Sequence, residues 1–468
     1  MHTALSTALS GQSTEPSRNG RITAPSSSQK QRAPTMRLRF DQQNSVDVGQ
    51  YSREPEPNVV PAIQGNHLAI QTFLQRQLHR PSRAEFSSAN LRPDYQSSER
   101  LIIKSPIDQT LIAHVQLEPQ TIGFGHVEIP ISRFRDLAVL PEFRHRGFGD
   151  TMLLEAEAEA KRSGAMLMVA RGEDYKILKK HGWSTLGSDP VSIASPQRFL
   201  GQLPAPKEPE SPFYASRMPN IEVRIGRLTD VDDLYELHQQ DQGHAYGPMV
   251  RSKERWAWLM SKQSHDRIYL FIENDVTMAY VVVSGSSIVE LIDVTDDSRG
   301  SARMLERVGA DAIDQGRHTL RIHCPIDNRV HQWADLAGGQ VFASATEDAW
   351  MVKVLSYRTL LRRLAPEIYK RRPRATNELS IRIGGEELLI KPGARSMKVT
   401  RGSSAKQRIG LTNRAAVQLF LGYRSASELA EKNELVASCD QALKTAEKLF
   451  PAQMLWRSRW DEMPVRKA

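Results

Sequence analysis

The stretch Arg133-Phe-Arg-Asp-Leu-Ala-Val-Leu-Pro-Glu-Phe-Arg-His-Arg-Gly-Phe-Gly-Asp150 decides how this chain is interpreted. Its first half has the residues of a strand, which Pro141 stops. Its second half is a glycine loop that leads directly into an amphipathic helix over residues 150–163. A glycine loop before a helix lets backbone N–H groups approach an anion, and the helix dipole favours negative charge there. Because Arg144 and Arg146 add positive charge to the same loop, the stretch predicts a phosphate-binding site.

The loop alone is equally consistent with an ordinary strand-to-helix turn that carries solvated arginines. The order of its surroundings is more specific. The amphipathic helix ends at Gly164, an apolar strand follows over residues 165–170, and a short helix ends at Gly182. The spacing lacks the Lys-Ser/Thr pair of a P-loop and the GxGxxG of a dinucleotide fold, so neither of these nucleotide-binding folds is predicted.

In this order the sequence resembles the GNAT family of acetyl-CoA-dependent N-acetyltransferases. The segment from Leu137 to Gly149 is similar to the pyrophosphate-binding motif of that family, and residues 175–183 are similar to its following helix-turn segment. The resemblance covers about residues 60–200. It implies acetyl-CoA as co-substrate, with a pantetheine arm paired to the backbone of Leu137, Ala138 and Val139. It also implies a pyrophosphate held by Arg144, His145, Arg146, Gly147, Phe148, Gly149 and Asp150.

The catalytic groups are less specific than the cofactor motif. The family often has a Tyr four residues before the glycine of the second motif, where it protonates the thiolate, but that position is Leu178 here. Tyr175, one helical turn earlier, is the candidate acid. His126 and Glu128, on the strand before the motif, are the candidate bases, acting directly or through water. All three residues also fit ordinary surface or packing positions.

Composition limits the remaining choices. The 468 residues are 40% hydrophobic and 25% charged, as in a soluble globular protein. The net charge of +9 attracts anions but selects none of them. Cys324 and Cys439 belong to no Cys/His cluster, so we expect a cytoplasmic protein without a metal site. No apolar run approaches the roughly 18 residues of a membrane helix, so no membrane span is expected.

The domain organisation follows from composition shifts and from a repeated order of elements. We expect a disordered tail over residues 1–60 and a mixed α/β unit over residues 61–200. A Pro-rich linker over residues 201–220 follows. Residues 221–354 repeat the element order of the first unit with little identity, and residues 355–468 form a third unit.

The second unit contains Asp296-Asp-Ser-Arg-Gly-Ser-Ala302 where the first has its glycine loop. The second glycine is missing and two acids precede the arginine, so we expect a degenerate unit that binds acetyl-CoA poorly. Glu290 and Asp293, on its central strand, are expected to face either a cationic acceptor amine or solvent.

The whole layout resembles the Eis-like proteins. The resemblance implies an α+β architecture with two GNAT-like domains in tandem and a C-terminal sterol-carrier-protein-like domain. It further implies an N-acetyltransferase that acts on a small-molecule or peptide amine, such as an aminoglycoside, polyamine or lysine amine, and that forms a homo-oligomer. In these proteins the C-terminal carboxylate can act as a base, but the terminal Pro464-Val-Arg-Lys-Ala468 lacks their aromatic end.

Two other functions stay open at this point. The Leu at position 178 is consistent with a non-catalytic protein that binds or senses acyl-CoA or a lipid. The basic run Lys370-Arg-Arg-Pro-Arg374 is consistent with contact to nucleic acid or an acidic lipid surface. Because no aromatic residues are interleaved with it, a solvated helix end is favoured and no nucleic-acid partner is expected.

Overall fold

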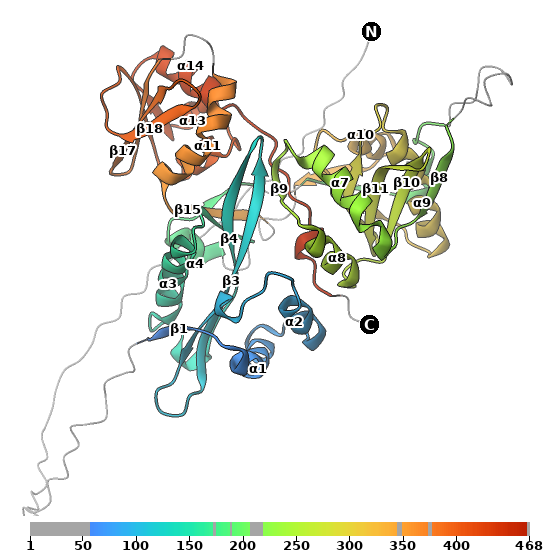
Figure 1. Ribbon diagram of the computed structural model, residues 1–468, viewed down its shortest axis with the longest axis horizontal. Helices are drawn as coiled ribbons and strands as arrows, with labels where there is room; N and C mark the ends of the chain where they lie inside the picture. Colours follow the sequence, from blue (N-terminus) through green and yellow to red (C-terminus); the bar gives the residue numbers. More distant parts are fainter. Residues whose placement is uncertain are drawn as a thin grey trace, which may run out of the picture. The chain divides into compact units, whose positions relative to one another are not determined.

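The computed structural model describes residues 57–171, 175–187, 190–205, 219–343, 349–372 and 377–465. From residue 57 onward these residues belong to one compact unit built on three β-sheets (Figure 1). The predicted tail lies outside the described residues up to position 56, and so does most of the predicted linker, at positions 206–218. The sheet begins at Val59, inside the range expected for the tail.

Sheet A contains the segment that decided the interpretation of the sequence. Its strand order is β1-β2-β3-β4-β5-β15-β6, and β9 also pairs with β3. The strands are β1 (Val59–Pro61), β2 (Arg100–Lys104), β3 (Leu111–Phe124), β4 (Val127–Val139), β5 (Leu167–Arg171), β6 (Ser184–Thr185), β9 (Tyr246–Met249) and β15 (Trp350–Val354). The long antiparallel pair β3–β4 runs through its centre (Figure 1).

Helices cover both faces of sheet A because alternate side chains of its strands point to opposite sides. Leu101 and Ile103 of β2 pack with one helix, whereas Ile102 between them packs with a helix pair. The single helix is α3 (Phe148–Arg162), and the pair is α1 (His67–Leu78) and α2 (Arg83–Asn90). The short helix α4 (Tyr175–Lys180) follows β5.

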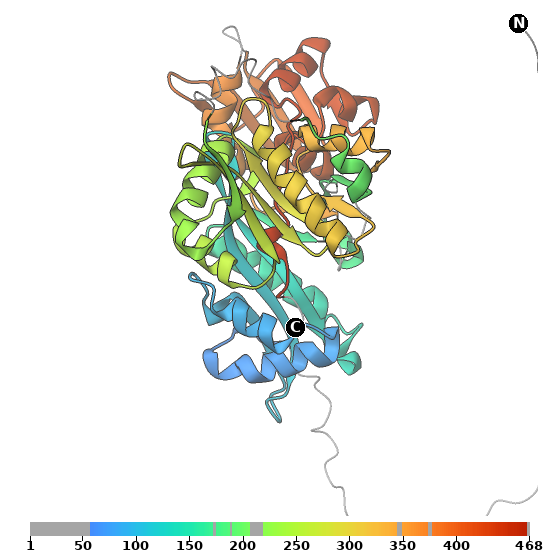
Figure 2. The same ribbon diagram turned by 90° about the vertical axis from the view of Figure 1, so that its right-hand side faces the viewer.

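Sheet B has the strand order β14-β7-β13-β12-β11-β10-β8. Its strands are β7 (Pro190–Ala194), β8 (Ile221–Ile225), β10 (Arg267–Glu273), β11 (Val276–Ser284), β12 (Ser287–Asp293), β13 (Leu320–Ile322) and β14 (Gln340–Ala343). One face is covered by α9 (Arg299–Asp314), which crosses the strands in Figure 2. The other face is covered by α7 (Val231–Gln242) and α8 (Lys253–Ser261). Trp256 of α8 is buried in the core that these helices form with the sheet. The helix α10 (Arg329–Leu336) packs on β7 and β14, and the short helix α5 (Pro196–Leu200) packs on α9 and α10.

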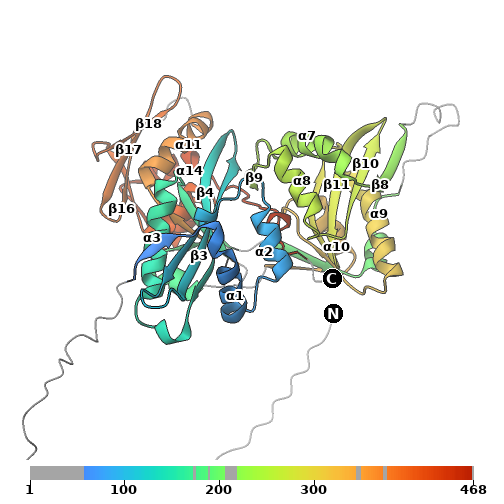
Figure 3. The ribbon, with the colours of Figure 1, turned by 60° about the horizontal axis from the view of Figure 1, so that its bottom comes forward.

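Sheet C has the order β18-β17-β16-β19-β20. The strands are β16 (Leu379–Ile383), β17 (Glu386–Pro392), β18 (Met397–Arg401), β19 (Gln407–Leu411) and β20 (Leu435–Ala437). Figure 3 shows strands β16 to β18 with α11 and α14. The helices of this part are α11 (Tyr357–Arg371), α12 (Asn413–Phe420), α13 (Ala426–Glu431) and α14 (Asp440–Leu449). Their core is continuous with the β3–β4 hairpin, since Ile122 and Ile129 belong to the same cluster as Leu379.

Sheets A and B exchange strands across the domain division expected from the sequence. β7 lies within residues 61–200 but pairs with β13 and β14 of sheet B. β15 lies within residues 221–354 but inserts between β5 and β6 of sheet A, where Val352 faces both Val169 and Ser184. As a domain assignment the division stays a prediction, but neither sheet is complete without a strand from the other range.

The elements predicted around the glycine loop are confirmed. The strand expected before Pro141 is the C-terminal part of β4, and the helix expected over residues 150–163 is α3. In the described ranges no helix is long and apolar enough to cross a membrane.

Candidate functional site

The parallel strands β4 and β5 separate from one another halfway along β4. They are paired only from Ile131, opposite Leu167, to Arg133, opposite Val169. Beyond Arg133 the strand β4 continues to Val139 with no partner on the β5 side among the described residues. We call this unpaired side of residues 134–139 the fork. Backbone groups there are available to an extended ligand that hydrogen-bonds like a strand.

A β-bulge in β4 determines how the fork is oriented. The β3–β4 register shifts between His114 and Gln116, and Asp136 has φ +54°. The buried His114 ring fixes this bulge, since its Nδ1–H donates to the Asp136 carbonyl at 2.9 Å while its Nε2 accepts from Arg100 at 3.3 Å. Burial, assisted by the Arg100 charge, lowers the pKa of His114 to about 3, so the ring is neutral and this pair of bonds defines its tautomer.

The bulge turns the backbone of the predicted pantetheine-binding residues toward the fork. The N–H of Leu140 donates to the Ile112 carbonyl at 2.9 Å, on the β3 side. Because successive residues of a strand alternate, the N–H groups of Leu137 and Val139 point to the opposite side, into the fork. Ala138 between them is paired with β3 and buries its side chain.

The loop after β4 presents a helix N-terminus without a cap. Gly147 has φ +87° and precedes α3, and no side chain caps the helix. Among the described residues, no side chain accepts a hydrogen bond from the N–H groups of Phe148, Gly149 or Asp150. A Cβ at Gly147 would meet nothing within 4 Å, so the space over these N–H groups is open. This is the arrangement that binds a phosphate.

The charged side chains of the loop leave that space positive. Arg144 donates to the Val139 carbonyl at 3.0 Å and to Gln77 at 3.2 Å, which fixes its stem beside the loop. His145 has φ +63°. The Asp150 carboxylate, which would repel a phosphate, accepts from His181 at 2.5 Å and Lys180 at 3.2 Å. Hydrogen bonds from these two partners lower the pKa of Asp150, and the Lys180 charge offsets the charge of the carboxylate.

The equivalent helix of sheet B is closed by its own side chains. Asp293 accepts from the Ser301 N–H at 2.6 Å, and Thr295 Oγ1 accepts from the Gly300 N–H at 3.3 Å. Asp297 accepts from the Arg299 N–H at 3.2 Å. The first three N–H groups of α9 are therefore already satisfied, and an acid occupies the place where a phosphate would bind. The expectation that Asp293 faces an acceptor amine or solvent does not hold.

A cavity of about 390 Å³ begins where the fork ends. Phe134, Arg135 and Asp136 of β4 line it directly before Leu137. The rest of the wall comes from α2, β2, β3, the C-terminal end of α8 and residues 459–465. A ligand extended along the fork would thus end beside this cavity. Ala468 lies outside the described residues.

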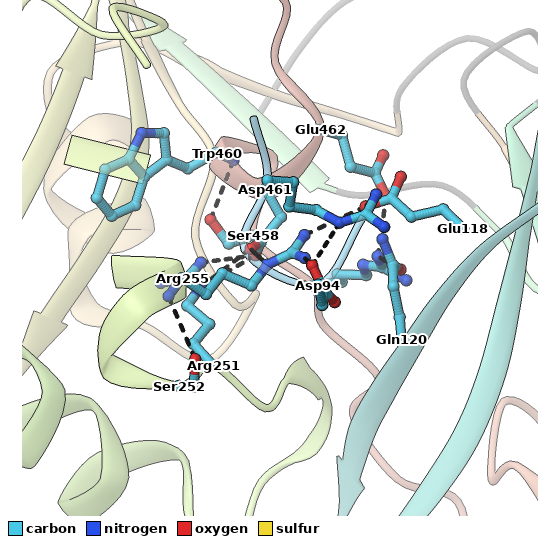
Figure 4. A network of polar contacts seen from close by, with 12 residues as sticks. Asp94, Glu118, Gln120, Arg251, Ser252, Arg255, Ser458, Trp460, Asp461 and Glu462 are labelled. Carbon is cyan, nitrogen blue, oxygen red and sulfur yellow. Dashed lines mark hydrogen bonds and ion pairs between the residues drawn. The ribbon is translucent and has the colours of Figure 1, made fainter. Parts of the chain in front are cut away.

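A network of arginines and carboxylates joins sheet A, sheet B and the C-terminal segment (Figure 4). Asp461 contacts Arg251 at 2.7 Å and Arg255 at 3.8 Å. Arg251 also donates to Glu290 at 2.6 Å, so this acid, like Asp293, is not directed at an acceptor. Glu118 of β3 contacts Arg255 at 3.3 Å (Figure 4).

Further contacts of the network lie at the cavity wall. Glu462 contacts Arg171 at 2.5 Å, Arg457 at 3.3 Å and Arg133 at 3.7 Å. Burial opposes ionisation of Glu462, but the surrounding arginines prevail and hold its pKa at about 2. Glu118 behaves in the same way, and its pKa lies well below the ordinary value. Both carboxylates are therefore weak bases at neutral pH.

The structure does not bring the predicted bases to the cofactor loop. His126 and Glu128 lie at the β3–β4 hairpin, where His126 stacks on His244 with ring centroids 4.1 Å apart. Glu128 precedes Leu137 by nine residues, which is about 30 Å along a strand. Tyr175 begins α4, but its side chain lies outside the described part of the structure. Leu178 is completely buried and apolar.

Sequence reasoning missed His114, Glu118, Lys262 and Glu462, all of which lie at the bulge or in the cavity wall. The last two lie at a helix end and in the C-terminal segment, where no motif marks them. The polar residues that alternate with apolar ones along β3, Glu118 and His114 among them, were the one available signal.

The model of the acetyltransferase (GNAT) family matches residues 69–176. No protein matches in a search of curated sequences. Three solved structures are similar over 86% of this chain and 99% of their own. They are a probable N-acyltransferase from Enterococcus faecalis (14% identity, TM-score 0.69), a GCN5-related N-acetyltransferase from Anabaena variabilis (14%, 0.66) and an Eis protein from Mycobacterium abscessus (13%, 0.59).

At these identities the structural similarities show a shared fold, and it extends over most of the chain. The family match covers the strands of the fork, the uncapped loop and α3. Residues 69–176 therefore match the GNAT acetyltransferase family, which uses acyl-CoA as co-substrate.

Proposed function

We propose that this protein transfers an acetyl group from acetyl-CoA to a primary amine. The observation that carries the proposal is the contrast between two helix N-termini. The N–H groups of α3 are open above Gly147, whereas those of α9 are occupied by Asp293, Thr295 and Asp297. A single cofactor site per chain follows, in the first unit.

The cofactor would be held along its whole length. The N–H groups of Leu137 and Val139 bind the pantetheine arm in the fork. The residues from Arg144 to Asp150 surround the pyrophosphate with N–H groups and guanidinium charge. This arrangement directs the thioester into the cavity next to Asp136.

Transfer is direct in this proposal. The amine nitrogen attacks the thioester carbonyl carbon, the C–S bond breaks, and the nitrogen loses a proton while the departing thiolate gains one. A backbone N–H of the fork polarises the carbonyl, and positioning supplies much of the remaining rate enhancement.

The surroundings of the amine favour its neutral, nucleophilic form. Positive charge near an ammonium lowers its pKa, and eight cationic side chains line the cavity against five carboxylates. Loss of the amine proton then needs no strong base, which agrees with the depressed pKa of Glu118 and Glu462. Tyr175 stays the candidate acid for the thiolate, since Leu178 has no proton to give.

The test is release of free CoA from acetyl-CoA in the presence of a panel of primary amines, with mass spectrometry of the product. Amine-dependent release with an acetylated product is expected. Acetyl-CoA binding without release in any amine would favour the second candidate, an acyl-CoA-binding protein, which the buried Leu178 in the acid position supports.

Three finer assignments rest on the resemblance of the sequence to the Eis-like proteins. We place the protein in the cytoplasm, as a homo-oligomer, with a sterol-carrier-protein-like third unit. The helices α11, α12 and α14, which cover one face of sheet C, support the last of these assignments. Light scattering tests the oligomer, and titration with a fluorescent fatty acid tests the third unit.

A further inference from the structure

The cavity beside the fork has an excess of positive charge. Eight cationic side chains line it against five carboxylates, an excess of three. The phosphates of acetyl-CoA would lie at the other end of the fork, at the α3 loop, and so would not neutralise it. Buried charge of one sign is costly unless a partner compensates it.

All five lining carboxylates already have protein partners. Glu118 and Glu462 each contact three arginines, and Asp461 contacts two. Asp136 pairs with Arg135 at 2.9 Å, and Glu85 accepts from the N–H of the residue that caps α2. Of the described carboxylates of the wall, only Glu85 has no cationic partner, and the other four are already paired with arginines. A polycationic acceptor would instead require several carboxylates without cationic partners in the wall.

Two lining cations have no carboxylate partner among the described residues. Lys262, at the C-terminal end of α8, lies over the Trp258 ring, with Nζ 4.7 Å from its centroid. Arg100 is almost completely buried and contacts only neutral groups, the Tyr95 hydroxyl at 3.1 Å and the His114 ring at 3.3 Å among them.

The pKa of Lys262 is consistent with the same excess of positive charge. Burial lowers it to about 7, and the charges of Arg133, Arg135 and Arg255 oppose the one favourable carboxylate, Glu118. An anion beside the ammonium group would remove this penalty, because it favours the charged form.

We propose that the acceptor amine carries an anionic group, a carboxylate or a phosphate, that pairs with Lys262 in this cavity. The inference rests on the proposed function and adds a substrate class to it. The anionic group anchors the acceptor to the cationic wall, while the same wall favours a neutral amine for attack. Polyamines and aminoglycosides lack this anchor and are repelled.

The experiment compares amines matched in size. They are β-alanine with propylamine, phosphoethanolamine with ethanolamine, and the diamine putrescine. The expected kcat/KM is about tenfold or more higher for the anionic member of a pair, the size of one charge-assisted contact. The two anionic probes distinguish a carboxylate from a phosphate. Equal rates within each pair, or a preference for putrescine, would overturn the proposal.

Substitutions of Lys262 test whether this residue causes the preference for anionic amines. Lys262→Gln is expected to abolish the preference by raising KM for β-alanine and phosphoethanolamine, and Lys262→Arg is expected to keep it. Because Lys262 has no acid partner, its loss leaves no carboxylate unpaired and the fold intact. Lys253→Gln, on the same helix and paired with Asp232 outside the cavity, is the control and should match the wild type. An equal fall of kcat for all amines in Lys262→Gln would indicate a base and overturn the proposal.

Binding separates this inference from the proposed function. If no amine is acetylated, the affinities of β-alanine and phosphoethanolamine for the CoA-bound protein are measured by calorimetry. Weaker binding in Lys262→Gln than in Lys253→Gln would support the anion site although the transferase proposal had failed. Equal binding in both variants, or none in the wild type, would overturn it.

Discussion

At the scale of single residues, the helices α3 and α9 differ in what caps them. A carboxylate at a helix N-terminus satisfies N–H groups and complements the dipole, so it stabilises the helix and excludes another anion. Asp293 does this for α9, and a glycine leaves α3 open. Three side chains, with Asp293 the most central, thus separate a structural helix end from a binding site.

The cap can be removed with a defined result. Asp293→Ala should lower the free energy of unfolding by about 1–2 kcal/mol, because Asp293 accepts from both Thr295 and Ser301. Urea denaturation measures this change. Asp296→Ala is the control, since Asp296 is exposed and should leave the unfolding midpoint unchanged. An equal effect of both substitutions would contradict the capping role.

His114 is the second residue on which the site depends. Its substitution by Leu removes the donor to the Asp136 carbonyl and the acceptor of Arg100. Leaving such buried groups unsatisfied costs about 1–3 kcal/mol each, so His114→Leu should lower stability by a few kcal/mol and weaken acetyl-CoA binding. Thermal unfolding and calorimetry check the two effects. A stable variant with unchanged affinity would show that the bulge does not depend on this ring.

At the scale of elements, local sequence patterns predicted most of the first unit. Strand-forming residues before Pro141 identified the end of β4, and the amphipathic pattern with Gly164 identified α3, because these signals lie within the element itself. The short strands β7 and β15 carry no signal for their partners. Their pairing joins residues 160 or more positions apart in β15 and 120 or more in β7. A short strand joins the sheet in which a neighbouring strand still has unpaired backbone groups. A local sequence pattern does not contain that information.

The strand exchange predicts that the first unit does not fold alone. A chain of residues 57–205 lacks β15, which exposes the β5 and β6 edges and removes Met351 from the core of sheet A. We expect it to lack a cooperative thermal transition, whereas residues 57–372 supply β15. Circular dichroism on heating distinguishes the two. A cooperative transition in the shorter chain would contradict the dependence on β15.

At the scale of the whole molecule, ion pairs connect the parts that form the cavity. The C-terminal segment carries two adjacent acids with different partners, Asp461 toward α8 and Glu462 toward β4 and β5. The cavity was not predictable from the sequence because its wall comes from elements scattered along the chain, and the acids and arginines that meet there have no fixed spacing. The cofactor half of the site was predictable because it is one continuous segment.

These ion pairs give the protein a defined pH dependence of stability. The folded pKa values of Glu462 and Glu290 are about 2, below their ordinary value near 4.5. That of His114 is about 3, below 6.5. A depressed folded pKa contributes stability above the unfolded pKa and loses it as pH falls toward the folded value. Urea unfolding midpoints should fall gradually from pH 8 to about 7, because the depressed pKa of Lys262 acts in the same direction, decline further below about 6.5 and fall steeply below about 4.5.

Glu462→Gln tests the network directly. It leaves Arg133, Arg171 and Arg457 without this counter-charge and should lower the free energy of unfolding at pH 7 by about 3–5 kcal/mol. The decline below pH 4.5 should also become shallower. Glu378→Gln, at an exposed acid directly before β16, serves as the control and should leave both properties unchanged. An unaltered acid decline in Glu462→Gln would contradict the assignment of the pH dependence.

The central claim is that one acetyl-CoA binds per chain above the open N-terminus of α3. Calorimetric titration of acetyl-CoA into the wild type, Gly147→Val and Gly164→Val tests it most directly. The two glycines flank the same helix, have φ values of +87° and +88°, and neither Cβ would meet an atom within 4 Å, so both variants carry the same backbone strain. We predict one site per chain in the wild type and in Gly164→Val, and an affinity at least about tenfold weaker in Gly147→Val. Unchanged binding in Gly147→Val, or two sites per chain, would contradict the account.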